Sequence, residues 1–459
     1  MTVLNREKIA TANKFYIKIN NNCNNNCLFC LDADNQNKPG PSQAYIEREI
    51  TRGRQELGAD KLIISGGEAT IDPNFLSYVK LGKKLGYTKI QVITNGRMFA
   101  YADFAQEAIK SGLNEITFSI HGHTPDLYEK LTNILGSFKQ ILQALRNVRQ
   151  YPEVIVNIDI VINKYNYQQL LEIINFYSQE FGIFEYDLLE VIPFGRAYHN
   201  RTELFFDLDE AWPYLEPVFK LAATDPRFYI WTNRFPVKYL EGYEILIQDP
   251  HKLLDEIRGR EQMFTEYLFQ DKPLHCADDW RCQHCYLSDF CQKLKLYKDK
   301  KEEPFFELAS WLDFKPGKKW FVELDKKAAD QAQAHWFKTK ELFIKLKTYG
   351  TLAELTKESL ALTDFQSLIK GQNLQFFNVP FCQLSDFKQV AFDFLIKRQQ
   401  LANENGQLDL NKFAQHYINN LFYVKAAKCS QCKYDQECGG WHINYIRQYG
   451  FKVLKPFKS

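Results

Sequence analysis

Two hydrophobic patterns alternate through the first 200 residues of this chain. Short apolar runs with strand character recur, and the segments between them, such as 137–150, have the spacing of amphipathic helices. Six consecutive strand and helix units imply a parallel sheet with right-handed crossovers, and therefore an α/β fold. The predicted strands are 15–20, 61–65, 89–94, 115–120, 154–162 and 186–192.

Polar or glycine-rich segments follow the first four of these strands directly. NNNCNNNCLFC (20–30) follows the first strand and GGE (66–68) the second, whereas Asn95 follows the third and Ser119 closes the fourth. Ligands of parallel sheets bind at the carboxyl ends of the strands. We therefore expect these segments, which lie far apart in sequence, to face one common mouth.

The 11 cysteines occur in groups with short spacings, which in a reducing compartment indicate metal binding rather than disulfides. The first group has the spacing C-x3-C-x2-C, and two later groups share a C-x2-C-x5-C unit. An aromatic-rich run, then Pro236 or Pro380, precedes each later unit, which indicates a duplicated module. The cysteines are Cys23, Cys27 and Cys30; Cys276, Cys282, Cys285 and Cys291; Cys382; and Cys429, Cys432 and Cys438.

Four protein ligands in each module would require Cys382 to join the last three cysteines, which leaves three cysteines in the first loop. A [4Fe-4S] cluster normally takes four thiolates, so three ligands leave one iron open to a group that is not protein. Alternatives remain for the two modules. Cys382 is also compatible with a buried free thiol, and either four-cysteine set with zinc. His275, His284 and His442 lie close enough in sequence to substitute as ligands.

The C-x3-C-x2-C loop, with Phe29 before its last cysteine and SGGE after the second strand, resembles the radical S-adenosyl-L-methionine (SAM) superfamily. The resemblance covers about residues 15 to 200 and implies a partial (βα)6 barrel of the TIM type. It implies that Cys23, Cys27 and Cys30 hold a [4Fe-4S] cluster whose open iron binds SAM. Reductive cleavage of SAM would then give a 5'-deoxyadenosyl radical that abstracts hydrogen from a substrate.

The resemblance also implies cofactor-binding residues. Gly66 and Gly67 would allow close backbone approach, and Glu68 would meet the ammonium group of SAM. Asn95, Thr132 and Asn163 match the family positions only loosely, and each is equally compatible with a turn or capping role. Ser119 is also compatible with a helix-capping role. The full set is Gly66, Gly67, Glu68, Ser119, Ile192, Asn95, Thr132 and Asn163.

Three further polar residues near the predicted mouth have simpler interpretations. Arg196 is expected to pair either with a carboxylate in the mouth or with a surface partner. We interpret His121 and His123 as polar loop residues rather than as acid–base groups.

Both C-terminal cysteine units resemble the auxiliary-cluster regions of SPASM and Twitch type, which implies two auxiliary [4Fe-4S] clusters in α+β modules. The expected domains are an N-terminal extension (1–14), the barrel core (15–204), a first auxiliary module (205–300), a helical insert or linker (301–370) and a second auxiliary module (371–459).

Charge and hydropathy exclude some classes of partner. The formal charge of +2 offers no field to attract nucleic acid. The sequence has neither a signal peptide nor an apolar run of membrane-spanning length, so we predict a cytoplasmic protein with no membrane partner.

These features predict a radical SAM enzyme that oxidises a peptide or protein side chain, with auxiliary clusters accepting the electron and a flavodoxin or ferredoxin as reductant. The 22 residues before Cys23 leave no room for a leader-binding domain, which counts against a peptide substrate. The alternative within enzymes is a small-molecule oxidase or rearrangement catalyst. From other classes, the alternatives are a non-catalytic iron–sulfur electron carrier and a zinc-binding module.

Overall fold

The computed structural model describes residues 3–299, 307–308, 320–331, 342–370, 375–384, 389–391 and 398–457. These residues form two compact units. The core unit is Ala12–Phe235, and the C-terminal unit combines Met1–Thr11 with Pro236–Ser459.

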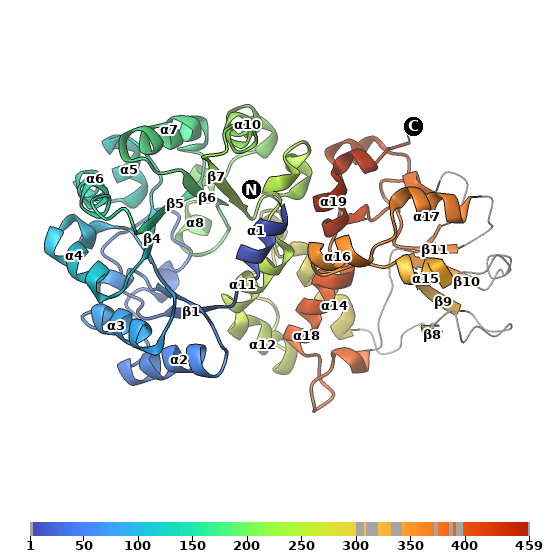
Figure 1. Ribbon diagram of the computed structural model, residues 1–459, viewed down its shortest axis with the longest axis horizontal. Coiled ribbons are helices and arrows are strands. Elements are labelled where there is room, and N and C mark those ends of the chain that lie inside the picture. The colour runs from blue at the N-terminus through green and yellow to red at the C-terminus, as the bar shows by residue number, and fades with distance from the viewer. Residues whose placement is uncertain are drawn as a thin grey trace. The chain divides into compact units, whose positions relative to one another are not determined.

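A single parallel sheet of seven strands, in the order β1-β2-β3-β4-β5-β6-β7, organises the core unit. Figure 1 shows this sheet curling inside a layer of helices, so the predicted α/β fold with a partial barrel is confirmed. The strands are β1 (Lys14–Lys18), β2 (Lys61–Ser65), β3 (Lys89–Thr94), β4 (Glu115–Ser119), β5 (Ile155–Ile162), β6 (Glu185–Glu190) and β7 (Tyr229–Asn233).

The helices of the core unit bury one apolar stripe each against the sheet. In α6 the buried stripe includes Phe138, Ile141, Leu145 and Val148, which have the spacing of one helix face. The helices are α2 (Gln43–Gln55), α3 (Phe75–Leu85), α4 (Ala102–Ser111), α5 (Pro125–Thr132), α6 (Ser137–Val148), α7 (Leu170–Phe181), α8 (Gly195–His199), α9 (Arg201–Leu204) and α10 (Leu208–Thr224).

The C-terminal unit has its own parallel sheet, in the order β12-β11-β10-β9-β8, and an antiparallel pair, β13-β14. Its strands are β8 (Glu307–Leu308), β9 (Trp320–Leu324), β10 (Leu342–Leu346), β11 (Gln375–Phe377), β12 (Gln389–Ala391), β13 (Tyr423–Val424) and β14 (Trp441–His442). Its helices are α1 (Val3–Ala10), α11 (Leu253–Arg258), α12 (Glu261–Phe269), α13 (Asp279–Gln283), α14 (Ser288–Asp299), α15 (Lys326–Gln331), α16 (Leu352–Glu358), α17 (Leu362–Ile369), α18 (Leu410–His416) and α19 (Ile443–Tyr449).

The N-terminal helix α1 is tied into the C-terminal unit by one buried carboxylate. Glu7 accepts hydrogen bonds from the backbone N–H groups of Leu352 at 2.6 Å and Ala353 at 3.1 Å, which are the first residues of α16. A carboxylate at a helix N-terminus stabilises the otherwise unpaired N–H groups there. Glu7 therefore fixes α1 beside α16.

Two segments differ from the sequence-based expectation. Residues 229–233, which we had placed in the first auxiliary module, form β7 and extend the sheet of the core unit to a seventh strand. Residues 301–370 are not a purely helical insert, since their described part contains β9 and β10 as well as helices; the remainder lies outside the described residues. WFVEL and LFIKL are rich in aromatic and β-branched residues, which favour strands.

The two aromatic-rich runs share one local conformation. Each strand, β7 or β11, is followed by a residue with positive φ (Arg234 at 69° or Asn378 at 54°), then an apolar residue, a proline and a 3-10 helix. The 3-10 helices are Val237–Leu240 and Phe381–Gln383. The repeat seen in the sequence is therefore also a repeat of backbone structure.

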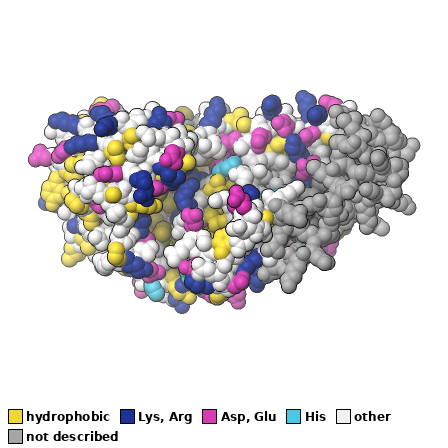
Figure 2. Space-filling model, turned by 90° about the horizontal axis from the view of Figure 1, so that it is seen from below, with side chains coloured by type: hydrophobic (Ala, Val, Ile, Leu, Met, Phe, Trp, Pro, Cys, Tyr) yellow, Lys and Arg dark blue, Asp and Glu magenta, His cyan; other side chains and the backbone are white. Residues whose placement is uncertain are grey.

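Charged side chains are interspersed over the described part of the surface. Figure 2 shows basic and acidic groups side by side on one face of the molecule, as the near-neutral formal charge of +2 requires. Among the described residues, no helix has both the length and the apolar character that a membrane crossing needs.

Candidate metal and cofactor site

The cysteine loop leaves the carboxyl end of β1 and gathers three thiols. Cys23, Cys27 and Cys30 are all free and half-buried. Burial raises the pKa of the Cys23 thiol to about 11. Burial raises the pKa of Cys27 most strongly, and the neighbouring Cys23 and Cys30 raise it further. Three thiolates this close and this buried repel one another, so a positively charged metal group would offset the cost. The donor set fits an iron–sulfur cluster with one open iron.

Backbone hydrogen bonds fix the shape of this loop from one side. The N–H of Asn26 donates to the carbonyl oxygen of Thr132 at 3.0 Å, and the N–H of Leu28 donates to that of Leu131 at 3.0 Å. The predicted cofactor residue Thr132 is buried, and its hydroxyl donates to the carbonyl oxygen of Tyr128 at 2.9 Å. Thr132 therefore supports the loop through its backbone.

Arg196 braces the same loop from the other side. Its backbone N–H donates to the carbonyl oxygen of Cys30 at 2.9 Å, and its Nη1 donates to that of Cys27 at 3.0 Å. Its Nη2 donates to Oε1 of Gln36. Neither predicted role of Arg196 is correct, because in the described part of the chain it forms no ion pair with a carboxylate.

Three glycines allow other segments to approach the loop. A Cβ atom on Gly67 would lie 2.4 Å from the carbonyl oxygen of Asn22, and one on Gly195 would lie 2.4 Å from that of Cys30. Gly195 also has a positive φ of 54°, which favours glycine. A Cβ on Gly66 would meet Oδ1 of Asn20 at 2.4 Å. The SGGE turn and the start of α8 therefore pack directly on the cysteine loop.

Glu68 uses its carboxylate within the protein. Oε1 accepts hydrogen bonds from the backbone N–H of Thr70 at 3.0 Å and from the hydroxyl of Thr94 at 2.7 Å, and Oε2 accepts one from the N–H of Asn95 at 2.7 Å. The side chain is buried, and this burial raises its pKa while the hydrogen bonds lower it. The carboxylate of Glu68 therefore links the ends of β2 and β3, and its contact with SAM stays a prediction.

Asn95 lies against the cysteine loop as predicted for a residue at this edge. Its Nδ2 donates to Oδ1 of Asn24 at 2.7 Å and approaches Sγ of Cys23 at 3.8 Å. Ser119, half-buried at the end of β4, pairs in register with Asp159 of β5. Both residues therefore lie at the carboxyl edge of the sheet.

The remaining predicted cofactor residues of the core unit are buried, and their contact with a cofactor stays a prediction. Asn163 is buried and closes a turn, donating to the carbonyl oxygen of Val161 at 3.0 Å. Ile192 is also buried. His121 is buried, which lowers its pKa to about 3, and its Nδ1 accepts from the N–H of Val161 at 3.1 Å. Its ring meets the edge of Phe29 with centroids 4.5 Å apart, so a neutral His121 supports the cysteine loop.

The first four-cysteine set lies on and around two helices of the C-terminal unit. Cys282 is in α13 and Cys291 in α14, whereas Cys276 precedes α13 and Cys285 lies between the two helices. Burial raises the pKa of Cys291, and the thiols of Cys285, Cys276 and Cys282 raise it further. The other three thiols therefore act electrostatically on Cys291. Arg260 lowers the pKa of both Cys276 and Cys291 through its charge.

The second set brings together cysteines that are far apart in sequence. Cys382, from the 3-10 helix after β11, lines one pocket with Cys429, Cys432 and Cys438. Lys425 and Asp435 also line this pocket, and their side chains form an ion pair at 3.0 Å. Cys382 therefore joins the last three cysteines as expected for a fourth ligand.

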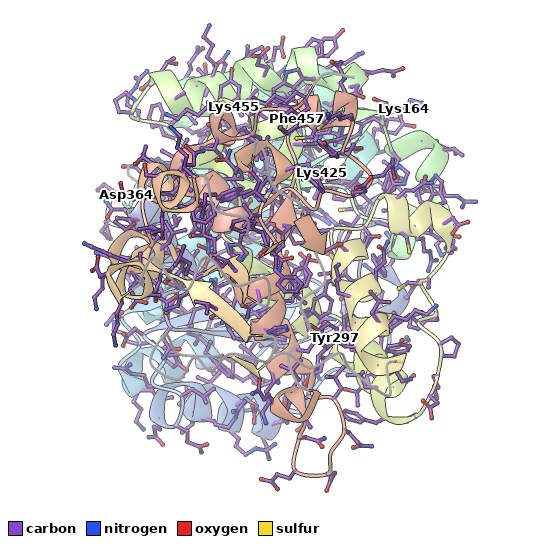
Figure 3. The ribbon with its side chains drawn as sticks, turned by 90° about the vertical axis from the view of Figure 1, so that its right-hand side faces the viewer. Lys164, Tyr297, Asp364, Lys425, Lys455 and Phe457 are labelled. Carbon is purple, nitrogen blue, oxygen red and sulfur yellow. The ribbon has the colours of Figure 1, made fainter. Side chains whose placement is uncertain are left out.

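The C-terminal segment closes this second pocket. The backbone N–H of Lys455 approaches Sγ of Cys382 at 3.3 Å, and Phe457 packs on Tyr434 with ring centroids 5.6 Å apart. Figure 3 labels Lys455 and Phe457 together with Lys425 of the pocket wall.

The histidines considered as substitute ligands have other surroundings. His275 is exposed, His284 bonds to the carbonyl oxygen of Trp280 at 2.9 Å, and the buried His442 bonds to that of Ile418 at 3.0 Å. Within the described ranges, no three His, Cys, Asp or Glu residues are grouped to hold a single metal ion. That finding concerns single-ion sites, whereas a cubane cluster spreads its thiolates over different irons.

Residues 17–177 match the family model described as the radical SAM superfamily. A probable GTP 3',8-cyclase of Saccharolobus solfataricus is 26% identical over 205 residues, which is 44% of this chain and 64% of that protein. One of Metallosphaera sedula is 26% identical over 177 residues, covering 38% and 54%. This chain thus spans less than two thirds of these curated relatives.

Among solved structures, Streptococcus suis SuiB bound to S-adenosylmethionine is similar, with a TM-score of 0.41, 17% identity and coverage of 50% of this chain and 52% of that chain. The family match lies on the strands and loops that carry the cysteine loop and the SGGE turn. Residues 17–177 therefore form a radical SAM domain, as the motifs implied.

Proposed function

We propose that this protein cleaves SAM reductively at a [4Fe-4S] cluster held by Cys23, Cys27 and Cys30, and uses the resulting radical to abstract hydrogen from a substrate. The observation that carries this proposal is the cysteine loop, whose three thiols converge at the carboxyl edge of the parallel sheet. When bound, the cluster and SAM supply the electron and the adenosyl radical.

The residues around the loop bind and orient rather than react. Gly66 and Gly67 bring backbone atoms to the loop without a side chain in the way. Asn95 and Ser119 place polar groups at the same edge, where the family resemblance expects SAM. Glu68 and Arg196 keep the loop in position, and the buried His121 packs its ring against Phe29 of the loop.

We further propose that the two four-cysteine sets each hold an auxiliary [4Fe-4S] cluster. The convergence of Cys382 with three cysteines from residues 429–438 supports this ligand partition. Four thiolates leave no iron open, which favours electron transfer over substrate binding.

The proposed substrate is a peptide or protein side chain that undergoes net oxidation. A substrate radical that loses a further electron needs an acceptor, and two auxiliary clusters would supply one. A flavodoxin or ferredoxin would deliver the electron that starts the cycle.

A small-molecule substrate is the second candidate, and the names of the curated relatives favour it. Those proteins are described as probable GTP 3',8-cyclases, although the similarity covers 44% of this chain for the first of them. Product masses separate the two candidates, because oxidation of a co-expressed peptide removes two hydrogen atoms from it.

Anaerobic reconstitution tests the central proposal. We expect about twelve irons per chain, falling to about eight in a Cys23/Cys27/Cys30→Ala triple variant. The wild type should release 5'-deoxyadenosine from SAM under dithionite, and the triple variant should not. Bound zinc, an unchanged iron count or intact SAM would instead support a zinc module or an electron carrier.

A further inference from the structure

Two of the three loop cysteines have a side-chain amide directed at their sulfur. Nε2 of Gln36 lies 3.9 Å from Sγ of Cys30, and Nδ2 of Asn95 lies 3.8 Å from Sγ of Cys23. Sulfur is a large acceptor, and its hydrogen bonds are correspondingly longer than those to oxygen. Both amides come from outside the three-cysteine motif, since Gln36 follows it and Asn95 ends the third strand unit.

The amide of Gln36 is oriented by Arg196. The guanidinium donates through Nη2 to Oε1 of Gln36, which leaves the NH2 group of the amide to face Cys30. The same guanidinium donates through Nη1 to the carbonyl oxygen of Cys27 at 3.0 Å. One arginine thus holds both the loop backbone and the donor that reaches the loop sulfur.

The amide of Asn95 is oriented in the same manner by the backbone around it. Its Oδ1 accepts from the N–H of Arg97 at 3.1 Å, and its own N–H donates to Glu68 at 2.7 Å. The Nδ2 group is therefore left to face Asn24 and Cys23. Gln36, oriented by Arg196, therefore faces the sulfur of Cys30. Asn95, held by Glu68, faces the sulfur of Cys23.

Hydrogen bonds to the sulfurs of an iron–sulfur cluster raise its reduction potential, because reduction adds a negative charge that the N–H groups stabilise. The effect is stronger in a site partly removed from water. We propose that Gln36 and Asn95 set the reduction potential of the cluster held by the first cysteine loop, with Arg196 and Glu68 as positioning residues. This inference rests on the proposed function, because it requires that cluster to form.

The step concerned is the uptake of one electron by the cluster from a reductant of the flavodoxin or ferredoxin class, with no bond made or broken. Gln36→Leu removes the donor at similar volume, and the half-exposed position makes loss of folding no concern. The matched control is Gln43→Leu, because Gln43 is exposed and its amide donates to the side chain of Glu47, at 2.8 Å, rather than to a cysteine.

The experiment is a redox titration followed by EPR, using the reduced signal whose g-values change when SAM is added. In Gln36→Leu we expect the ratio of reduced to oxidised cluster at a fixed potential to fall about two- to tenfold, with unchanged iron content. Gln36→Glu keeps an acceptor for Arg196 but adds negative charge, so its ratio should fall further. The control should match the wild type.

The outcomes separate this inference from the function on which it rests. If the wild type shows no signal that responds to SAM, the proposed function is wrong. If that signal is present but keeps its midpoint in both Gln36 variants, only the role of Gln36 and Arg196 is overturned. A fall of equal size in Gln43→Leu would also contradict it.

Discussion

Nη1 of Arg196 donates to the carbonyl oxygen of Cys27 at 3.0 Å, although 169 positions separate the two residues in sequence. The bond joins the segment after β6 to the loop after β1, two strands that are not neighbours in the seven-stranded sheet. The guanidinium therefore fixes the position of the cysteine loop relative to the segment after β6.

Arg196→Lys should therefore impair iron loading at the first loop. Lysine keeps the charge but cannot donate in two fixed directions, so the bonds to Cys27 and Gln36 are not both restored. We expect the iron content to fall from about twelve towards about eight per chain, as in the triple cysteine variant. Arg48→Lys is the control, because the Arg48 side chain is 68% exposed. Full iron content in Arg196→Lys would contradict the bracing role.

Gly67→Ala should displace the cysteine loop without unfolding the sheet. The added Cβ would lie 2.4 Å from the carbonyl oxygen of Asn22 and 2.5 Å from that of Asn21, and backbone atoms cannot move aside as a flexible side chain can. Overpacking of this kind costs about 1 to 3 kcal/mol. Binding of SAM to the reconstituted protein, measured by equilibrium dialysis, should weaken at least tenfold.

Gly259→Ala is the matched control for that experiment. A Cβ atom at Gly259 would meet its nearest neighbours, the carbonyl oxygens of Asp255 and Glu256, at an ordinary 3.6 Å. The substitution should therefore leave SAM binding and the midpoint of thermal unfolding as in the wild type. Equal weakening in both variants would show that close packing at Gly67 is not the cause.

Glu68→Gln should destabilise the core unit. The carboxylate accepts from three donor residues, Thr70, Thr94 and Asn95, and a glutamine amide would turn an NH2 group towards some of these donors. Leaving a buried donor unpaired costs about 1 to 3 kcal/mol. Chemical denaturation should show this loss, and spectra of the reconstituted protein should show reduced iron at the first loop. Wild-type stability would mean that Glu68 is not the link between β2 and β3.

The sequence predicted the features of this fold that depend on local patterns. Two predicted strands coincide with β2 (Lys61–Ser65) and β3 (Lys89–Thr94), because parallel strands that are buried almost throughout leave a clear apolar run in the sequence. The seventh strand also had a strand pattern in FYIWTN, yet its likeness to the run before Pro380 led us to place it with the auxiliary module. A repeat can cross the boundary between compact units, and here it does.

The contacts around the cysteine loop could not be predicted in the same manner. Nothing in SGGE tells whether the Glu68 carboxylate faces a ligand or the protein, since the answer depends on Thr94 at the end of the next strand. Nothing near Arg196 in sequence indicates Cys27 as its partner. The only available signal for Gln36 was its position a few residues after the motif, within reach of the loop.

Cys382→Ser should remove the auxiliary cluster of the second set alone. Cys382 lines the same pocket as Cys429, Cys432 and Cys438, so its loss leaves one iron of that cluster without a thiolate and, unlike the first loop, without SAM as the proposed replacement. We expect about eight irons per chain and continued release of 5'-deoxyadenosine, because the first loop is intact. An unchanged iron count would indicate that Cys382 is a buried free thiol rather than a cluster ligand. Measuring the iron content together with the released 5'-deoxyadenosine distinguishes loss of the auxiliary cluster from loss of the cluster at the first loop.

Glu190, at the carboxyl end of β6, should make the stability of the core unit depend on pH. Burial raises its pKa to about 8, and the charge of Arg234 offsets only part of that rise. Between the ordinary pKa of glutamate, about 4.3, and about 8, the folded chain keeps a proton that the unfolded chain has lost. The contribution of Glu190 to the free energy of unfolding therefore falls as pH rises through this window and is constant above it. Glu190→Gln removes the titration, so the difference in unfolding midpoint between the variant and the wild type should grow in favour of the variant from pH 5 to pH 8. A difference that does not change with pH would show that Glu190 is ionised in the folded protein at neutral pH.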